Sequence, residues 1–258
     1  MTKTTTAPVH LDERDGVLVI TMNRPEARNA VNAALAHAVA DALDQLESRD
    51  DLRVGILTGA GGTFCAGMDL KAFLRGESPR VASRGFLGLI EHTLVKPLIA
   101  AVEGYALAGG LEAALACDLV VAARDARFGI SEVKRGLAAT GGGLYRLPRK
   151  IPINIAMEMA LTGEPIDGER AAALGLVNRL TAPGDALDEA RRLAATIVAN
   201  APLSVAASKR VVIAQQDWQL DEMVSRQDEI AGHLLRSEDA REGAAAFAEK
   251  RPPRWRGR

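Results

Sequence analysis

The sequence contains few cysteines and few aromatic residues, and neither sign of charge is in clear excess. Cysteine occurs only at Cys65 and Cys117, outside any Cys-x-x-Cys pair, which argues against a disulfide scaffold or a structural zinc site. We expect both to be small buried hydrophobic side chains. The net charge is −1, so electrostatics favour neither nucleic acid nor an anionic membrane as a partner.

Long hydrophobic runs are also missing. No stretch approaches the roughly 18 apolar residues that span a bilayer, and the opening MTKTTTAPVH lacks the apolar segment of a secretory signal. The sequence therefore predicts a cytoplasmic globular protein without a membrane partner. The one local excess of charge is the basic tail, residues 250–258, which is interpreted either as a solvated terminus or as a contact for an anionic ligand.

Several common functional motifs are absent. The glycine-rich stretch 59–64 has Phe64 where a dinucleotide fingerprint needs glycine, and no Gly-x-x-x-x-Gly-Lys-Ser/Thr loop occurs. The Gly-x-Ser-x-Gly elbow of serine hydrolases is missing too, and the four histidines lie in no recognisable catalytic context. We expect no metal and no redox cofactor.

Strand and helix patterns alternate through the first part of the chain. Runs of β-branched and aliphatic residues predict strands at 17–22, 54–58, 97–102 and 119–122. Apolar residues at helical spacing predict a helix at 32–48, with Asn32 as its N-cap, and a short helix at 111–116 after a turn at 104–110. This alternation indicates an α/β core with mostly parallel strands.

The last part of the chain is mainly helical. Helices are predicted at 153–162, 168–174, 185–200, 202–215, 219–235 and 238–249, and only 176–180 is expected to be extended. Asn200-Ala201-Pro202 interrupts the helical pattern. We therefore divide the chain into a core, residues 1–200, and a C-terminal helical lobe, residues 201–258.

Two glycine-containing turns share a sequence context. FCAGMDL (64–70) and GYALAGGLEAALACD (104–118) each follow a predicted core strand and lead into a helix. Such turns expose backbone N–H groups at a helix N-terminus, where negative charge is favoured. Two facing N–H donors would form an oxyanion hole. The alternative is that the glycines only permit tight packing of a strand against a helix.

A series of segments resembles the crotonase superfamily, the enoyl-CoA hydratases and isomerases. The resemblance runs in order from about residue 15 to the C-terminus. It is carried by NRPEARNAV (23–31), FCAGMDL (64–70), GYALAGGLEAALACDL (104–119), FGISEVKRGL (128–137), GGGLYRLPR (141–149) and LTGEPIDGERAAALGLVNRL (161–180).

The resemblance implies a fold, an assembly and a class of ligand. The fold is a spiral of repeated ββα units with a C-terminal helical lobe that mediates trimerisation, and the implied assembly is a homotrimer or a hexamer. The implied ligand is an acyl-CoA thioester, so coenzyme A enters as part of the substrate and not as a cofactor. The implied activity is hydration of a 2-enoyl-CoA, a step of fatty acid and lipid metabolism.

The resemblance also assigns roles to particular residues. The amides of Met68 and Gly109 correspond to the oxyanion hole, and Glu112 and Glu132 to the two catalytic acids of hydratases. Glu112 is already unusual in an apolar helix, because a buried carboxylate is costly unless it is paired or functional. We assign water activation chiefly to Glu112 and proton donation to the substrate Cα chiefly to Glu132.

The coenzyme A contacts implied by the resemblance lie in the first two motifs. Backbone groups near Ala27 and Ala66 are expected around the adenine. Lys71 is expected to reach the phosphates, unless it is a solvated helix lysine, and Arg28 to assist it.

The sequence departs from the common hydratase pattern at one position, because Ala139 stands where many members have proline. A looser turn there would affect acyl-chain selectivity. The VKRGL and GGGLYRLPR segments are similar to the carnitinyl-CoA dehydratase branch, although a trimethylammonium substrate favours an aromatic or acidic cage. Enoyl-CoA isomerase and a non-catalytic acyl-CoA-binding subunit are further alternatives, and the presence of both glutamates argues against each.

Overall fold

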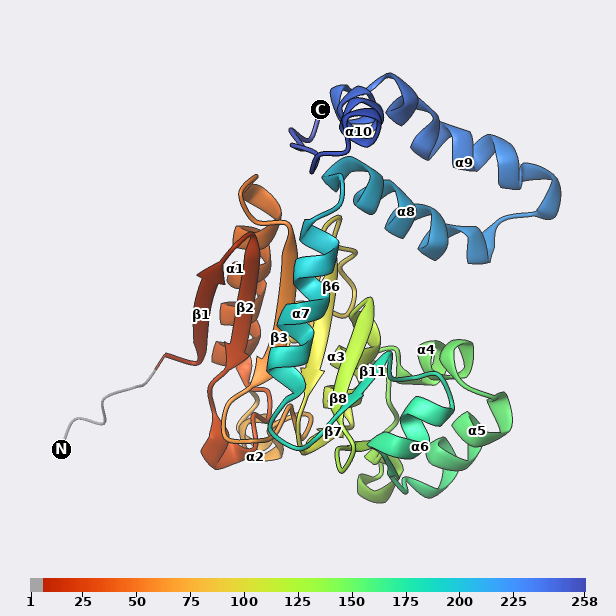
Figure 1. Cartoon of the computed structure of the whole chain (residues 1–258). Helices are drawn as coiled ribbons and strands as arrows, with labels where there is room; N and C mark the ends of the chain where they lie inside the picture. Colours follow the sequence, from red (N-terminus) through yellow and green to blue (C-terminus); the bar gives the residue numbers. More distant parts are fainter. Residues whose placement is uncertain (1–6) are drawn as a thin grey trace.

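The computed structural model describes residues 7–258, and its central feature is a six-stranded sheet (Figure 1). The strand order is β1-β2-β3-β6-β8-β11, and every neighbouring pair is parallel except β1 and β2. The strands are β1 (Val9–Arg14), β2 (Val17–Met22), β3 (Val54–Gly59), β6 (Leu98–Val102), β8 (Leu119–Ala123) and β11 (Arg179–Thr181). The four predicted core strands are present, which confirms the mostly parallel α/β core.

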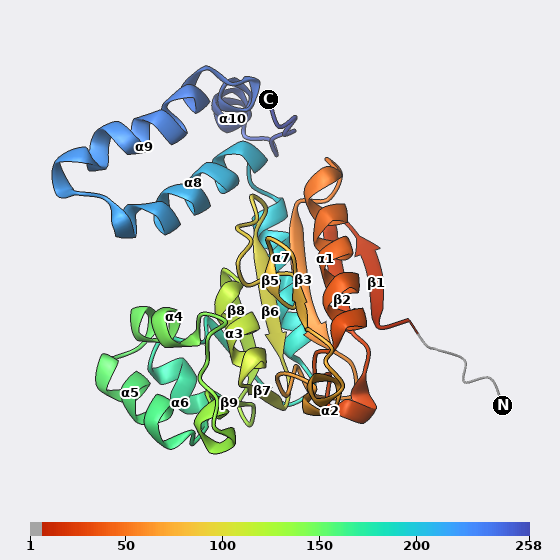
Figure 2. The same ribbon diagram turned by 180° about the vertical axis from the view of Figure 1, so that it is seen from behind.

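Helices cover both faces of this sheet. Helix α7 (Ala186–Val198) lies across one face (Figure 1), where its Ala190 and Ala194 pack onto β-branched side chains of the strands. Helix α1 (Ala33–Ser48) lies on the other face (Figure 2) and buries an apolar stripe. The Asn32 side chain accepts a hydrogen bond from the Leu35 amide at 3.0 Å, which confirms the predicted N-cap.

A second, three-stranded sheet lies beside the first, in the order β10-β9-β7. Its strands are β7 (Tyr105–Leu107), β9 (Arg127–Gly129) and β10 (Ile166–Asp167). The predicted turn at 104–110 is therefore wrong in part, since it contains β7 and the start of α3 (Gly109–Ala116). The difference arises because β7 is stabilised by parallel pairing with β9, which is distant in sequence.

The remaining elements are helices and short strands. They are α2 (Leu70–Leu74), β4 (Arg80–Val81), β5 (Gly85–Phe86), α4 (Gly143–Lys150), α5 (Ile153–Thr162), α6 (Gly168–Ala173), α8 (Pro202–Ala214), α9 (Met223–Ala231) and α10 (Glu238–Glu249), with 3₁₀ turns η1 (Pro25–Ala27), η2 (Glu132–Arg135), η3 (Gln215–Asp217), η4 (Leu220–Glu222) and η5 (Gly232–Arg236).

Two other predicted elements differ from the structure. The expected helix 219–235 is divided into η4, α9 and η5: a capping box between Gln219 and Glu222 marks its start, and its last turns tighten into 3₁₀ geometry. The extended segment expected at 176–180 corresponds to β11, which begins only at Arg179. Leu176 and Val177 are buried before the strand starts.

Helices α8 to α10 form an arm that projects away from the sheet (Figures 1 and 2). Our proposed division at residue 200 falls in the short break between α7 and α8. Among residues 7–258 no single helix is long and apolar enough to cross a membrane. One pair of successive helical segments, 186–198 and 202–217, reaches that length and apolar character when taken together, but the two are bent by 109° relative to each other.

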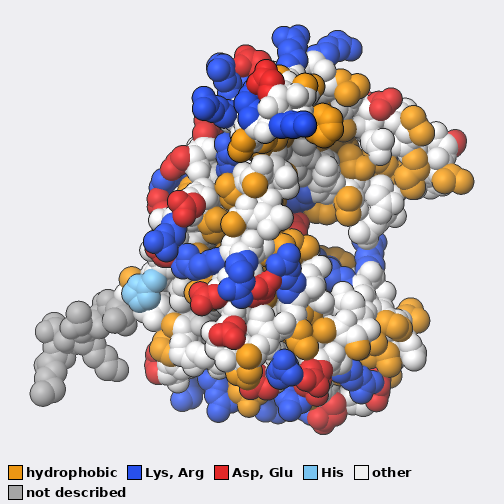
Figure 3. Space-filling view, viewed as in Figure 1, with side chains coloured by type: hydrophobic (Ala, Val, Ile, Leu, Met, Phe, Trp, Pro, Cys, Tyr) orange, Lys and Arg blue, Asp and Glu red, His pale blue; other side chains and the backbone are white. Residues whose placement is uncertain are grey.

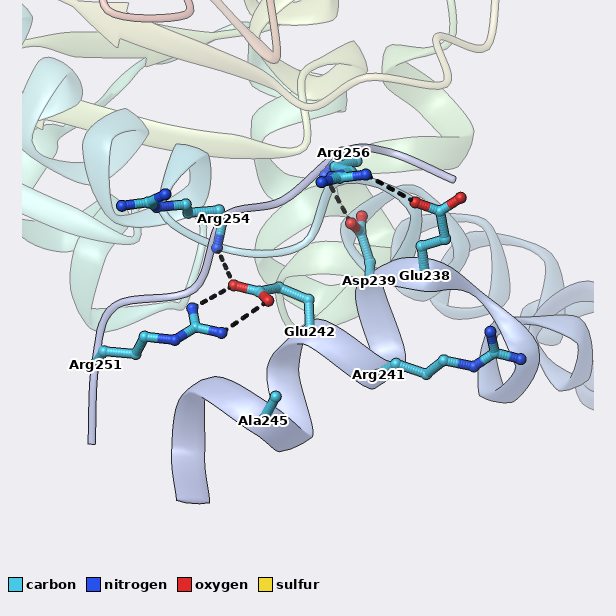
Figure 4. Close-up of a pocket in the computed structure, with 8 residues that line it drawn as sticks. All are labelled: Glu238, Asp239, Arg241, Glu242, Ala245, Arg251, Arg254 and Arg256. Atoms are coloured by element: carbon cyan, nitrogen blue, oxygen red, sulfur yellow. Dashed lines mark hydrogen bonds and ion pairs between the residues drawn. The ribbon is translucent and has the colours of Figure 1, made fainter. Parts of the chain in front are cut away.

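The basic tail folds back along α10 (Figure 4). Glu242 receives two hydrogen bonds from the Arg251 guanidinium, at 2.6 and 3.0 Å. The buried Asp239 accepts hydrogen bonds from the amides of Arg256 and Gly257 at 2.6 and 2.9 Å. The acids of α10 therefore compensate much of the positive charge of this tail within the chain.

Candidate active site

A cavity of about 660 Å³ opens where the two glycine-containing turns meet. Residues from both turns, from η2 and from the β4–β5 region line it. The lining includes Ala66, Met68, Phe73, Arg80, Phe86, Ala108, Gly109, Glu112, Glu132, Lys134, Arg135, Leu137, Ala138 and Gly141. The cavity therefore contains both predicted acids and both predicted oxyanion-hole residues.

Backbone pairing places the two turns side by side. The Cys65 amide donates to the Tyr105 carbonyl at 2.7 Å, and the Leu107 amide donates to the Cys65 carbonyl at 3.0 Å. Side chains would not fit where the turns touch, because a Cβ on Gly110 would overlap the Cys65 carbonyl. The glycines thus have a packing role, which does not exclude a role in binding.

The amides of Met68 and Gly109 are both available at this junction. Among the loop and turn hydrogen bonds of residues 7–258, neither the Met68 amide nor the Gly109 amide donates to a backbone carbonyl. Gly109 is also the first residue of α3, and the first N–H groups of a helix have no partner within the helix. Ala108 has φ 50° and ψ −126°, a conformation rarely adopted by a side-chain-bearing residue. A Cβ on Gly67, next to Met68, would lie 3.3 Å from the Gly109 nitrogen, so the two peptide groups are close neighbours.

The NRPEARN segment fixes the first of these turns. The Asn29 side chain is fully buried, and its amide nitrogen donates to the carbonyls of Ala60 and Thr63 at 2.9 and 2.6 Å. The Val31 amide donates to the Gly67 carbonyl at 2.8 Å. Sequence reasoning gave Asn29 no role. An asparagine in the turn between a predicted strand and a predicted helix was the only available signal.

An ion pair supports the same turn from the other side. Arg24 Nη2 lies 2.9 Å from Asp69 Oδ2, and the other Asp69 oxygen accepts hydrogen bonds from the amides of Lys71 and Ala72 in α2. The Asp69 amide in turn donates to the Val31 carbonyl at 2.9 Å. Residues on both sides of Met68 are therefore held, so its amide direction is set by the backbone and not by its side chain.

Glu112 is a buried carboxyl group on α3. It is 4% exposed, and the Gly143 amide donates to its Oε1 at 2.9 Å. Burial raises its pKa, while the amides of Gly143 and Gly141 and the charge of Arg146 act in the opposite direction. A hydrogen-bonded carboxylate of this kind is suited to accept a proton.

Glu132 lies at the start of η2, on the wall of the same cavity. Its Oε2 is buried and has no hydrogen-bond partner among the residues that the structure describes. Burial, together with a smaller contribution from the charge of Glu112, raises the pKa of Glu132 to about 7. Glu112 therefore ionises first, and Glu132 retains its proton to near-neutral pH. The two carboxyl groups can thus act as base and acid at one pH.

The turn after Glu132 is mostly exposed. Residues 133–138 and Thr140 are open to solvent, and only Ala139, 2% exposed, is buried, close to Gly143. The looser turn expected at Ala139 stays a prediction.

The four predicted coenzyme A residues fall into two groups. Ala66 lines the cavity, and its amide donates to the Arg28 carbonyl at 3.0 Å, which brings Ala27 and Arg28 beside it. The Arg28 guanidinium lies 5.5 Å from the centre of the Tyr105 ring. Lys71 is exposed on α2 and is not part of the cavity wall.

The cysteines do not contribute a nucleophile. Both are buried free thiols, which confirms the expectation from the sequence. Burial raises the pKa of Cys65 and of Cys117 to about 12, so the reactive thiolate is scarce at neutral pH.

Comparison with known proteins gives a consistent result. The sequence profile described as Enoyl-CoA hydratase/isomerase matches residues 12–258. The chain is 41% identical to a carnitinyl-CoA dehydratase of Proteus mirabilis (strain HI4320), over 97% of this chain and 98% of that protein. It is 42% identical to a carnitinyl-CoA dehydratase of Salmonella enteritidis PT4, with the same coverage.

Solved structures extend this similarity to the fold. An enoyl-CoA hydratase from Mycobacterium marinum superposes with a TM-score of 0.96 at 60% identity, covering 98% of this chain and 100% of that one. A carnitinyl-CoA hydratase from Mycobacterium avium has a TM-score of 0.79 at 44% identity, with the same coverage. The crotonase-type fold predicted from the sequence motifs is confirmed.

Proposed function

Because the chain belongs to the enoyl-CoA hydratase/isomerase family, we propose that it is a hydro-lyase that adds water reversibly, with syn geometry, to a 2-enoyl-CoA thioester. One observation carries the proposal. Two buried carboxyl groups of different proton affinity line one cavity, next to two backbone amides that are free to donate.

The amides of Met68 and Gly109 are assigned to the thioester oxygen. When water attacks Cβ, the electron pair of the double bond moves toward the carbonyl and leaves enolate-like charge on that oxygen. Fixed N–H donors stabilise this charge without reorganising, which is worth about 3–4 kcal/mol per donor in comparable sites. The N-terminal position of Gly109 on α3 adds to the effect.

The two glutamates are assigned to the proton transfers. The Glu112 carboxylate accepts a proton from the attacking water as the C–O bond forms at Cβ. Neutral Glu132 donates its proton to Cα as the enolate collapses. The pair therefore ends with the proton on Glu112, and dehydration begins from that arrangement. Both directions require the same singly protonated pair.

The substrate thioester supplies the coenzyme A. The adenine is placed near Ala27 and Ala66, whose backbones are adjacent, and Lys71 and Arg28 are assigned to the phosphates. The exposure of Lys71 outside the cavity fits a contact with the outer part of the coenzyme A moiety. The cytoplasmic location expected from the sequence stays a prediction.

The alternatives within and outside the family are weaker. An enoyl-CoA isomerase needs one acid to move a proton, and a non-catalytic acyl-CoA-binding subunit needs none. Neither alternative explains why the second carboxyl group, that of Glu132, lies in a site that raises its pKa to about 7. Burying a carboxyl group costs stability, and such a cost is typical of a functional residue.

A carnitinyl substrate is disfavoured by the side chains of the cavity wall. The only aromatic rings among the lining residues are Phe73 and Phe86. Three cationic side chains line the cavity: Arg80 pairs with Glu91, Lys134 pairs with Glu164 at 2.5 Å, and Arg135 is the third. The one lining acid besides the catalytic pair, Glu77, pairs with Arg75 at 2.8 Å. A trimethylammonium group favours an aromatic or acidic cage, which these residues do not form.

We therefore expect crotonyl-CoA to be hydrated with a kcat/KM about a hundredfold or more above that for crotonobetainyl-CoA. The loss of ultraviolet absorbance of the conjugated thioester measures both reactions. Equal rates, or a preference for crotonobetainyl-CoA, would assign the chain to the carnitinyl branch. Turnover of neither thioester, nor of longer and branched analogues, would contradict hydratase activity.

We propose that the arm of α8 to α10 mediates a homotrimer or a hexamer. Large apolar side chains remain exposed on it (Figure 3), including Leu220, Val224, Leu235 and Phe247, each at least 72% exposed. Burial of such a surface is the expected consequence of association. Light scattering or native mass spectrometry is expected to give three or six times the chain mass, and a monomer at micromolar concentration would contradict this proposal.

A further inference from the structure

Arg146, on α4, bridges Gly141, which lines the cavity, and Ile90, which lies in the turn after the lining residue Phe86. Its Nη1 donates to the Gly141 carbonyl at 3.3 Å, and its Nη2 donates to the Ile90 carbonyl at 2.7 Å. The guanidinium also lies 4.8 Å from the centre of the Tyr145 ring. One planar group is thus oriented by three contacts.

The first of these contacts supports the turn that holds Glu112. Gly141 and Gly143 flank the Glu112 carboxylate: the Gly143 amide donates to it at 2.9 Å, and a Cβ on Gly141 would lie 2.5 Å from its Oε2. The turn has no room to shift toward the acid. A hydrogen bond that fixes the Gly141 peptide therefore also fixes the direction of the donors that orient Glu112.

The second contact supports the oxyanion-hole side of the cavity. Ile90 ends a turn in which its amide donates to the Phe86 carbonyl at 3.3 Å. The Phe86 ring packs against Gly109, since a Cβ there would lie 2.5 Å from the ring. Arg146 thus connects the turn that holds Glu112 to the packing around the Gly109 amide.

The charge of Arg146 acts on Glu112 as well. Three charged groups influence this carboxyl group within the described chain: Arg146 on α4, Arg80 on β4, and Glu132 on η2. Both arginines lower the pKa of Glu112, against the effect of burial. Arg80 is engaged in an ion pair with Glu91, whereas no carboxylate lies within salt-bridge distance of Arg146 among residues 7–258.

We propose that Arg146 is a positioning residue for the proposed hydration: it holds turn 141–143 so that the Glu112 carboxylate stays directed at the water. The inference rests on the proposed function. It makes Arg146 act through Glu112, without contact to the substrate.

The test compares Arg146→Gln and Arg146→Lys with the matched control Arg149→Gln, which alters an exposed arginine of the same helix. We expect Arg146→Gln to lower kcat about ten- to a hundredfold, since small misplacement of a catalytic group has effects of this size. The acidic limb of its kcat/KM profile is expected to move to higher pH, with KM changed less than kcat. Arg149→Gln is expected to match the wild type.

Arg146→Lys separates charge from geometry. Lysine keeps the positive charge but lacks the planar fork that spans two carbonyls, so we expect kcat to fall while the acidic limb stays near the wild-type position. If Arg146→Gln is insoluble, the lysine variant alone decides. Wild-type kcat and an unmoved acidic limb in either variant would overturn the inference. Inactivity of the wild type toward enoyl thioesters would instead reject the proposed function.

Discussion

Replacing Glu132 with glutamine is expected to slow hydration of crotonyl-CoA by about 10²–10⁴-fold, the usual cost of removing an acid–base group. Glutamine keeps the shape of the side chain and can still contact the substrate, but it has no proton to donate to Cα. The loss is therefore expected in kcat, with KM changed little. Glu112→Gln is expected to fall in the same range, because the amide cannot accept the proton of the water.

The matched control for these variants is Glu169→Gln, an exposed glutamate 63% accessible at its side chain. It is expected to retain wild-type kcat and KM. Rates within a few-fold of wild type for Glu132→Gln would contradict the role assigned to Glu132 and favour the isomerase or binding alternatives.

The same substitution is expected to stabilise the fold at alkaline pH. The pKa of Glu132, about 7 in the folded chain, is raised above its value in the unfolded chain, so the folded state binds more protons between these two values. Stability contributed by the protonated group is therefore lost as pH rises through that window. We expect Glu132→Gln to raise the thermal midpoint by a few degrees at about pH 8 and by less at about pH 5. A raised thermal midpoint would show that the lower activity of Glu132→Gln does not come from misfolding.

Replacing Gly109 with proline is expected to reduce kcat by about 10²–10³-fold, because it deletes the N–H assigned to the thioester oxygen. Proline is tolerated at the first position of a helix, so α3 itself is expected to persist. Its ring would press on Phe86, and the preceding Ala108 already has an uncommon conformation. Gly109→Ala is therefore the matched control, since it adds the same Cβ and keeps the amide.

Infrared spectra of a bound ¹³C-labelled thioester provide a direct readout of this donor. We expect the carbonyl stretch to shift to lower frequency on binding to the wild type and to Gly109→Ala, and to lose most of this shift in Gly109→Pro. Met68→Ala is expected to keep the shift, because that residue contributes its backbone. An unchanged shift in Gly109→Pro would remove Gly109 from the oxyanion hole.

The sequence predicted the core strands and the Asn32 cap because these features depend on local residue patterns. Runs such as Val17–Met22 are recognisable without tertiary context, and so is a helix of the spacing found in α1. The two acids proposed for the site, Glu112 and Glu132, were predicted because the resemblance identified their motifs. Glu112 alone carried an independent signal, as a single acid in an apolar helix.

The features that sequence reasoning missed depend on contacts between distant segments. Strand β7 exists because it pairs with β9 and with Cys65, and three residues of a glycine-flanked segment give little local indication of it. Asn29 and Arg146 act through carbonyls that lie far from them along the chain. The raised pKa of Glu132 likewise depends on burial beside Glu112, whereas in sequence it stands next to exposed Lys134 and Arg135.

The central claim is that two carboxyl groups on one side of the substrate deliver water and a proton to the same face. Hydration of crotonyl-CoA in D₂O, followed by NMR of the 3-hydroxybutyryl product, tests it most directly. We expect one deuteron at Cα, in a single diastereomer, on the same face as the new hydroxyl group. A mixture of diastereomers, or deuterium on the opposite face, would contradict delivery by the Glu112 and Glu132 pair.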